Sequence, residues 1–163
     1  MALQTDPALP GLQAYADAAF ADAYFNVYRL YTENWTGATC DDKERALAWA
    51  AVLLNNVKFK GNKVKVDDSL DWPRYNVFKS NGSSEVYASD ELPILLQYAN
   101  CELAFHLIEK DRTILYEENL GLNSLSVGGI SLNFDNTRKE NTIPNYVFNL
   151  LKPVSFTGQM VRT

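Results

Sequence analysis

Apolar residues recur at helical spacing along about four stretches of the chain. In the first stretch, which begins near Ala14, aromatic residues at steps of four, four and three share one helix face: Phe20, Tyr24, Tyr28 and Tyr31. Such a face can stack nucleic-acid bases. Rings at this spacing more often belong to a core or a subunit contact, and we favour that interpretation. The segment 34–39, which contains Gly37, ends the helix.

The other helical stretches have clearer ends. The second begins at Thr39 or Asp41, either of which can act as N-cap, and ends at Gly61-Asn62. The third runs from Asp90 to Asp111, with Pro93 in its first turn. A short last helix follows Pro144 and is stopped by Pro153.

The segment 122–134 has the period of a β-hairpin. Apolar and polar residues alternate after Gly128-Gly129, and the apolar positions of the second strand are Ile130, Leu132 and Phe134. An isolated hairpin is only marginally stable in water. It must therefore lie on the helices or pair with another chain, and its apolar face is a candidate partner interface.

The two ends and one long loop have no period. Residues 1–13 predict an extended N-terminal arm, 14–152 a helical domain, and 153–163 a C-terminal tail. In the tail, Phe156, Met160, Val161 and Arg162 are candidate contacts to a partner. In the loop 72–89 we expect Trp72 to be an anchor that pins the loop to the core. The sequence thus predicts a mainly α protein: a small bundle of about four helices with one β-hairpin and extended N- and C-terminal arms.

Charge argues against a dominant phosphate-binding surface, since the net charge is -5 and the pI about 4.9. The main basic cluster consists of Lys58, Lys60, Lys63 and Lys65. Asp67, Asp68 and Asp71 follow at once and cancel much of its field. We favour a solvated helix end there over a phosphate site.

The sequence offers no pattern for catalysis, cofactors or metals. His106 is the single histidine and has no partner at metal or catalytic spacing, and the two cysteines, Cys40 and Cys101, indicate reduced thiols. We therefore expect a protein that is not an enzyme and needs no cofactor. The N-terminus is unlike a signal peptide, and no apolar run approaches the ~20 residues of a membrane span, so we expect a soluble protein made in a cytoplasm.

Several short motifs carry a resemblance to a known family. They span roughly residues 14–152 and occur in this order: Ala21-Asp22-Ala23-Tyr24-Phe25, Leu70-Asp71-Trp72-Pro73-Arg74, Leu92-Pro93, Glu102-Leu103-Ala104, Val127-Gly128-Gly129-Ile130 and Ile143-Pro144. Their order resembles the head–tail connector (adaptor) proteins of tailed bacteriophages, some of which are also described as DnaT-like single-stranded-DNA-binding proteins. The segment 80–89 and the tail after Pro153 do not match that pattern.

This resemblance implies a structural adaptor in the neck of a virion, assembled in the host cytoplasm. Identical subunits would form a ring, commonly twelve-fold, between the portal protein and the tail or nozzle proteins, and DNA would pass through the lumen without sequence recognition. The C-terminal segment would reach toward the portal. The alternative is a DnaT-like replication accessory protein that binds single-stranded DNA. A binder needs exposed rings beside a basic groove, and the rings here are spaced for burial, so we favour the adaptor.

Overall fold

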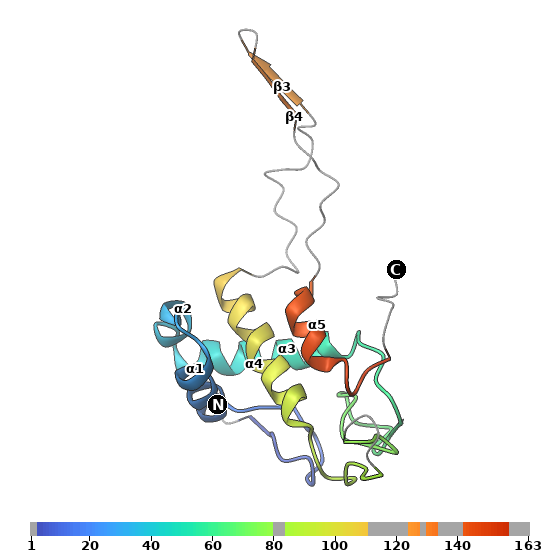
Figure 1. The fold of residues 1–163 in the computed structure, drawn as a ribbon. Coiled ribbons are helices and arrows are strands. Elements are labelled where there is room, and N and C mark those ends of the chain that lie inside the picture. Colours follow the sequence, from blue (N-terminus) through green and yellow to red (C-terminus); the bar gives the residue numbers. More distant parts are fainter. Residues whose placement is uncertain (1–2, 80–83, 111–123, 128–129, 134–141, 157–163) are drawn as a thin grey trace.

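A computed structural model describes residues 3–79, 84–110, 124–127, 130–133 and 142–156. Over these residues the fold is mainly helical, as predicted (Figure 1). The helices are α1 (Ala18–Tyr28), α2 (Glu33–Thr36), α3 (Cys40–Leu54), α4 (Ile94–Glu109) and α5 (Asn145–Leu151). The strands are β1 (Asn62–Lys63), β2 (Arg74–Tyr75), β3 (Ser124–Val127) and β4 (Ile130–Asn133).

The hairpin forms where the alternation predicts it. β3 and β4 are antiparallel, and Val127 pairs with Ile130 across the turn. The long loop adds a second antiparallel pair, in which Asn62 of β1 faces Tyr75 of β2. These strands of two residues each are too short to leave a period in the sequence.

The first predicted helix is divided in two. Asp17 is the N-cap of α1, because its carboxylate accepts a hydrogen bond from the Phe20 N–H at 2.7 Å. The helix ends at Tyr28, since Arg29 has extended backbone angles. A separate helical turn, α2, follows and buries Trp35. The prediction of one continuous helix through Tyr31 is therefore wrong.

The second predicted helix ends earlier than its glycine suggested. Thr39 is the N-cap of α3, as expected, but the C-cap is Asn55. Gly61 instead precedes β1 with φ +71°, and a Cβ there would lie 2.3 Å from the Tyr75 carbonyl oxygen. A glycine is needed at position 61 because two backbone segments approach closely there, and not because a helix ends there.

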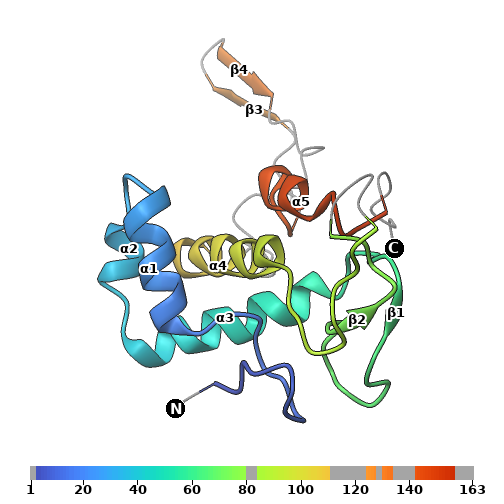
Figure 2. The same ribbon diagram turned by 60° about the horizontal axis from the view of Figure 1, so that its bottom comes forward.

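The core lies between α3 and α4, which α1 and α5 flank (Figure 2). Leu47 and Leu54 of α3 are fully buried, as is Leu96 of α4, and α5 adds Val147. The polar side chain of Asn100 in α4 is also fully buried. Its amide donates to the Leu47 carbonyl oxygen at 3.1 Å.

The N-terminal segment is not a free arm. It has neither helix nor strand, yet Leu12 and Tyr15 are buried in the core. The Tyr15 N–H donates to the Asn100 carboxamide oxygen at 3.3 Å. Lys65 Nζ also holds the segment, because it donates to the carbonyl oxygens of residues 7, 8 and 9 at 3.1, 3.3 and 2.9 Å. Residues 3–16 thus belong to the domain.

The first residues of the expected tail are likewise part of the core. Val154 and Ser155 are fully buried, and Ser155 pairs with Phe59 in an antiparallel bridge. The Lys60 N–H donates to the Val154 carbonyl oxygen at 2.9 Å. The boundary expected at residue 153 therefore falls within packed structure.

The loop residue Trp72 is fully buried in the same region. Its ring meets Phe59 edge-on at 6.0 Å between centroids and Tyr87 at 5.8 Å. Arg74 also holds the loop against the segment that follows α3, because its guanidinium donates hydrogen bonds to the carbonyl oxygens of Lys60 (2.8 Å) and Gly61 (2.7 Å). The loop is thus tied to the segment that follows α3.

Candidate functional site

Aromatic rings from α1 and α4 meet on the surface and form what we call the tyrosine platform: Phe20, Tyr24, Tyr28 and Tyr98. Tyr24 and Tyr98 are stacked with centroids 4.5 Å apart and an interplanar angle of 30°. Tyr28 lies 5.1 Å from Tyr24 and 5.6 Å from Tyr98, and Phe20 lies 6.1 Å from Tyr98. Tyr28 is 63% exposed, and the other three rings are partly buried. The ring of Tyr28 is therefore exposed to solvent, while the partly buried rings of Tyr24 and Tyr98 hold it in place.

The spacing of the aromatic residues predicted part of this surface. Phe20, Tyr24 and Tyr28 share a helix face as expected, but Tyr31 lies beyond the end of α1 and is 76% exposed. Tyr98 was missed. It lies in a helix that is apolar on most sides, so no period marks it as a partner of the α1 rings.

A charged network supports the platform from below. Glu102 of α4 is 5% exposed and forms an ion pair with Arg29, which follows α1. Its carboxylate also accepts hydrogen bonds from the hydroxyls of Tyr24 (2.8 Å) and Tyr146 (2.9 Å). The guanidinium of Arg29 lies 4.5 Å above the ring of Phe105. One carboxylate thus joins α1, α4 and α5.

The network fixes the charge of Glu102. Burial would raise the pKa of its carboxyl, but hydrogen bonds from Arg29, Tyr24 and Tyr146 outweigh burial and lower that pKa below its usual value. Burial, and then the neighbouring Glu102, raise the pKa of both tyrosine hydroxyls. The carboxylate is therefore ionised and the tyrosines are neutral at ordinary pH.

His106 has a defined place in this network, although its sequence neighbours offer it no partner at metal or catalytic spacing. Its Nε2 lies 2.6 Å from the Tyr146 hydroxyl. That hydroxyl donates its one proton to Glu102 and accepts from Arg29 at 2.8 Å. His106 must then donate from Nε2, which sets its tautomer.

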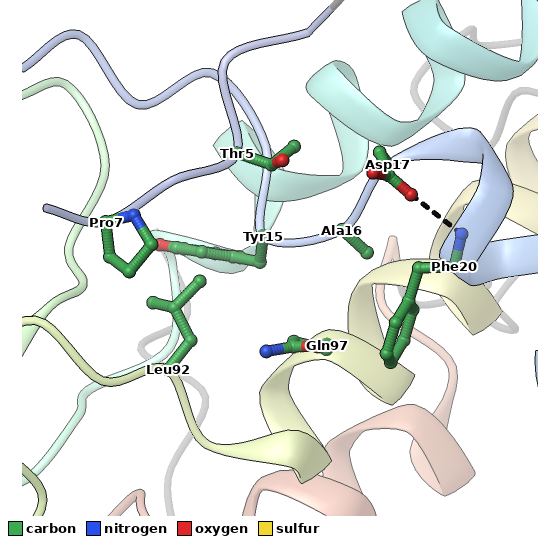
Figure 3. Close-up of a pocket in the computed structure, with 8 residues that line it drawn as sticks. All are labelled: Thr5, Pro7, Tyr15, Ala16, Asp17, Phe20, Leu92 and Gln97. Atoms are coloured by element: carbon green, nitrogen blue, oxygen red, sulfur yellow. Dashed lines mark hydrogen bonds between the residues drawn. The ribbon is translucent and has the colours of Figure 1, made fainter. Parts of the chain in front are cut away.

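A small cavity adjoins the Phe20 end of the platform (Figure 3). Its volume is about 180 Å³, and it is lined by Thr5, Pro7, Tyr15, Ala16, Asp17, Phe20, Leu92 and Gln97. The Asp17 carboxylate in its wall is already engaged as the N-cap of α1. The cavity is smaller than the ~300–1,000 Å³ of typical ligand pockets, so we do not assign it a ligand.

Three of the four lysines in the basic cluster stabilise the fold. Lys60 Nζ donates to the Pro153 carbonyl oxygen at 3.1 Å, and Lys63 donates to a backbone carbonyl of the loop that follows it. Lys65 holds the N-terminal segment. α3 ends before all of these residues, so the prediction of a solvated helix end is wrong, and these three ammonium groups are occupied by carbonyl oxygens.

The expected partner contacts fall largely outside the described side chains. Phe134, Met160, Val161 and Arg162 lie outside the described residues, and for Ile130 and Leu132 only the backbone strand is described. Phe156 is described and is 61% exposed. Its N–H donates to the Lys58 carbonyl oxygen at 3.0 Å, so its backbone is fixed beside the core.

The described residues contain no group of three or more His, Cys, Asp or Glu side chains placed to hold a metal ion. Cys101 is buried and Cys40 is exposed, and both are free thiols. Within the same part of the chain, no helix has the length and apolar character needed to span a membrane.

Comparison with known proteins identifies one family. The model of the family described as "Putative DnaT-like ssDNA binding protein" matches residues 1–163, the whole of the chain. Neither a curated protein nor a solved structure matches it.

This match contradicts the head–tail adaptor prediction and supports its alternative, the DnaT-like single-stranded-DNA-binding protein. The adaptor was preferred because the rings looked spaced for burial, yet Tyr28 is largely exposed. The portal and tail proteins were expected from the adaptor interpretation, and they lose their support with it. The ring was expected from that interpretation and from the hairpin and extended ends, and nothing in the family match supports it.

Proposed function

The chain belongs to the family of DnaT-like ssDNA-binding proteins, and on that ground we propose that it binds single-stranded DNA through the tyrosine platform. The observation that carries the proposal is the family match over residues 1–163. The platform supports the proposal because its aromatic rings can stack on the bases that an unpaired strand exposes. We also propose that the role is binding and not catalysis.

The geometry of the platform suits stacking. Tyr28 exposes most of its ring, while Tyr24 and Tyr98 hold it through contacts of 5.1 and 5.6 Å. A ring held in place loses little conformational freedom when a base settles on it. Stacking of one base on an aromatic side chain contributes about 1–3 kcal/mol, so a few rings suffice for measurable affinity.

The test is fluorescence anisotropy with a labelled oligothymidylate and with a duplex of the same length. We expect the single strand to bind and the duplex to bind far less. Tyr28→Ala should weaken binding of the single strand by about 5- to 150-fold, the equivalent of one lost stacking contact.

A matched control is Tyr75→Ala. Tyr75 is 45% exposed but lies in β2, which Figure 2 shows at the opposite end of the helices from α1. This variant should bind like the unaltered protein. If Tyr28→Ala binds normally while its circular dichroism is unchanged, the platform is not the site. If the unaltered protein does not bind oligothymidylate, the proposed function is wrong.

A further inference from the structure

We infer that the tyrosine platform holds a single strand by its bases, with little contribution from the phosphates. The inference rests on the proposed function and specifies how the same surface recognises its ligand. Two observations carry it: the cations near the platform are occupied, and the ring spacing does not match a stacked strand.

Arg29 shares Glu102 with Tyr24 of the platform, and Glu102 binds it through two nitrogens. Lys43 of α3 is also paired, and its Nζ lies 3.0 Å from Asp22 of α1. Asp22 also accepts a hydrogen bond from the Trp35 indole at 2.7 Å, so this acidic group is fixed in place. A phosphate that approached either cation would have to displace a bound carboxylate.

Two more cations on the described surface are also paired with carboxylates. Arg45 pairs with Asp42 at 2.9 Å, and Lys79 pairs with Glu91 at 2.9 Å. Lys110, which follows α4, is exposed and has an interaction partner of its own. Lys58 and Lys152 are exposed as well. They belong to the segments that follow α3 and α5, which Figure 2 shows at the far end of α4 from α1. The described surface therefore lacks a basic groove that leads along the platform.

The spacing of the rings selects an unstacked strand. Side chains four residues apart on a helix are about 6 Å apart along its axis, whereas nucleotides of a stacked strand rise by about 3.4 Å each. A strand that follows Phe20, Tyr24 and Tyr28 must therefore separate its bases. Thymine stacks weakly on its neighbours and is easily separated, so thymidine runs should bind more tightly than adenosine runs.

These features predict an unusual dependence on salt. For single strands, the slope of log K against log salt is about −0.7 for each phosphate that is neutralised. With one such contact or none, raising salt from about 50 to 200 mM should weaken binding by at most about 3-fold. A binder that neutralises four phosphates would lose about 50-fold over the same range.

The experiment compares three oligomers of equal length, each measured with the whole chain at low and high salt. The first is oligothymidylate, the second is a thymidine methylphosphonate oligomer with an uncharged backbone, and the third is an abasic deoxyribose phosphate oligomer. We expect the first two to bind within about 3-fold of each other, since one phosphate contact at most separates them. The abasic oligomer should not bind. Tyr28→Ala should weaken the binding of the two oligomers that carry bases.

The outcomes separate this inference from the proposed function. Binding of oligothymidylate with a steep salt slope, or binding of the abasic oligomer, would overturn the inference and leave DNA binding intact. Failure of the methylphosphonate oligomer to bind would do the same. Absence of oligothymidylate binding at every salt concentration would remove both proposals together.

Discussion

Replacing the buried Glu102 by glutamine should destabilise the fold substantially. The substitution keeps the shape of the side chain but removes the charge that Arg29 faces and one of the acceptor oxygens that Tyr24 and Tyr146 use. The three donors, Tyr24 of α1, Arg29 just after α1 and Tyr146 of α5, would then compete for a single carbonyl oxygen.

The magnitude follows from burial. Removing one partner of a buried ion pair costs about 3–5 kcal/mol, because the other charge is left uncompensated. Here the Arg29 side chain is 27% exposed and can partly turn to water. We therefore expect a loss of about 2–3 kcal/mol in the free energy of unfolding, or roughly 5–10 °C in Tm for a chain of this size.

The assay is urea unfolding followed by circular dichroism, with Glu33→Ala as control. Glu33 is exposed in the first turn of α2, so its loss should cost no more than about 0.3–1 kcal/mol. A double-mutant cycle with Arg29→Met tests the pair itself and should give a coupling energy of about 1–2 kcal/mol.

The effect should also depend on pH. Because the pKa of Glu102 is lowered in the folded protein, its contribution is present above its unfolded value of about 4.3 and is lost as pH falls through the lower, folded pKa. The unaltered protein and Glu102→Gln should thus differ most near neutral pH and converge in acid. A Glu102→Gln protein within about 0.5 kcal/mol of the unaltered one at neutral pH would refute the reasoning.

Three further substitutions or probes test the packing. Gly61→Ala should lower the free energy of unfolding by about 2 kcal/mol or more, because φ is +71° and the new Cβ meets the Tyr75 backbone. Urea midpoints equal to those of the unaltered protein would contradict this. Val154→Ala should cost about 2 kcal/mol in the same assay, since the side chain is fully buried, whereas a loss below about 0.5 kcal/mol would mean that the end of the chain is not part of the core. Cys40 should react with a thiol reagent in the native protein and Cys101 only in urea, because Cys101 is buried and burial raises its pKa; rapid labelling of both would show that α4 opens readily.

The parts of the fold that could be predicted are those whose causes are local. The start of α3 follows from its N-cap Thr39, which is visible in the sequence. The existence of α4 could also be predicted, but it begins at Ile94 with Pro93 as N-cap, and not at Asp90 as expected. The hairpin follows from strict alternation around two glycines. The end of α1 could not be predicted, because Arg29 leaves the helix where Glu102, 73 residues away, binds it.

The candidate site divides in the same way. Helical spacing alone placed Phe20, Tyr24 and Tyr28 on one face, and this part of the platform could be predicted. Tyr98 and the network below it arise from the packing of α1, α4 and α5, which spacing within one helix does not encode. His106 looked isolated for the same reason, because its partner Tyr146 is 40 residues away in sequence.

The bridge between Phe59 and Ser155 has a consequence for how the chain folds during synthesis. This contact and its flanking hydrogen bonds join segments about 95 residues apart. Closing a loop of that length costs on the order of 4 kcal/mol in chain entropy before its contacts are made. On the ribosome the helices can form and pair early, but the pocket around Trp72 and Phe59 stays open until residues 154–156 have been made. Until these residues leave the ribosome, the emerging chain exposes the aromatic side chains of Trp72 and Phe59, and a translational stall before that point would prolong their exposure.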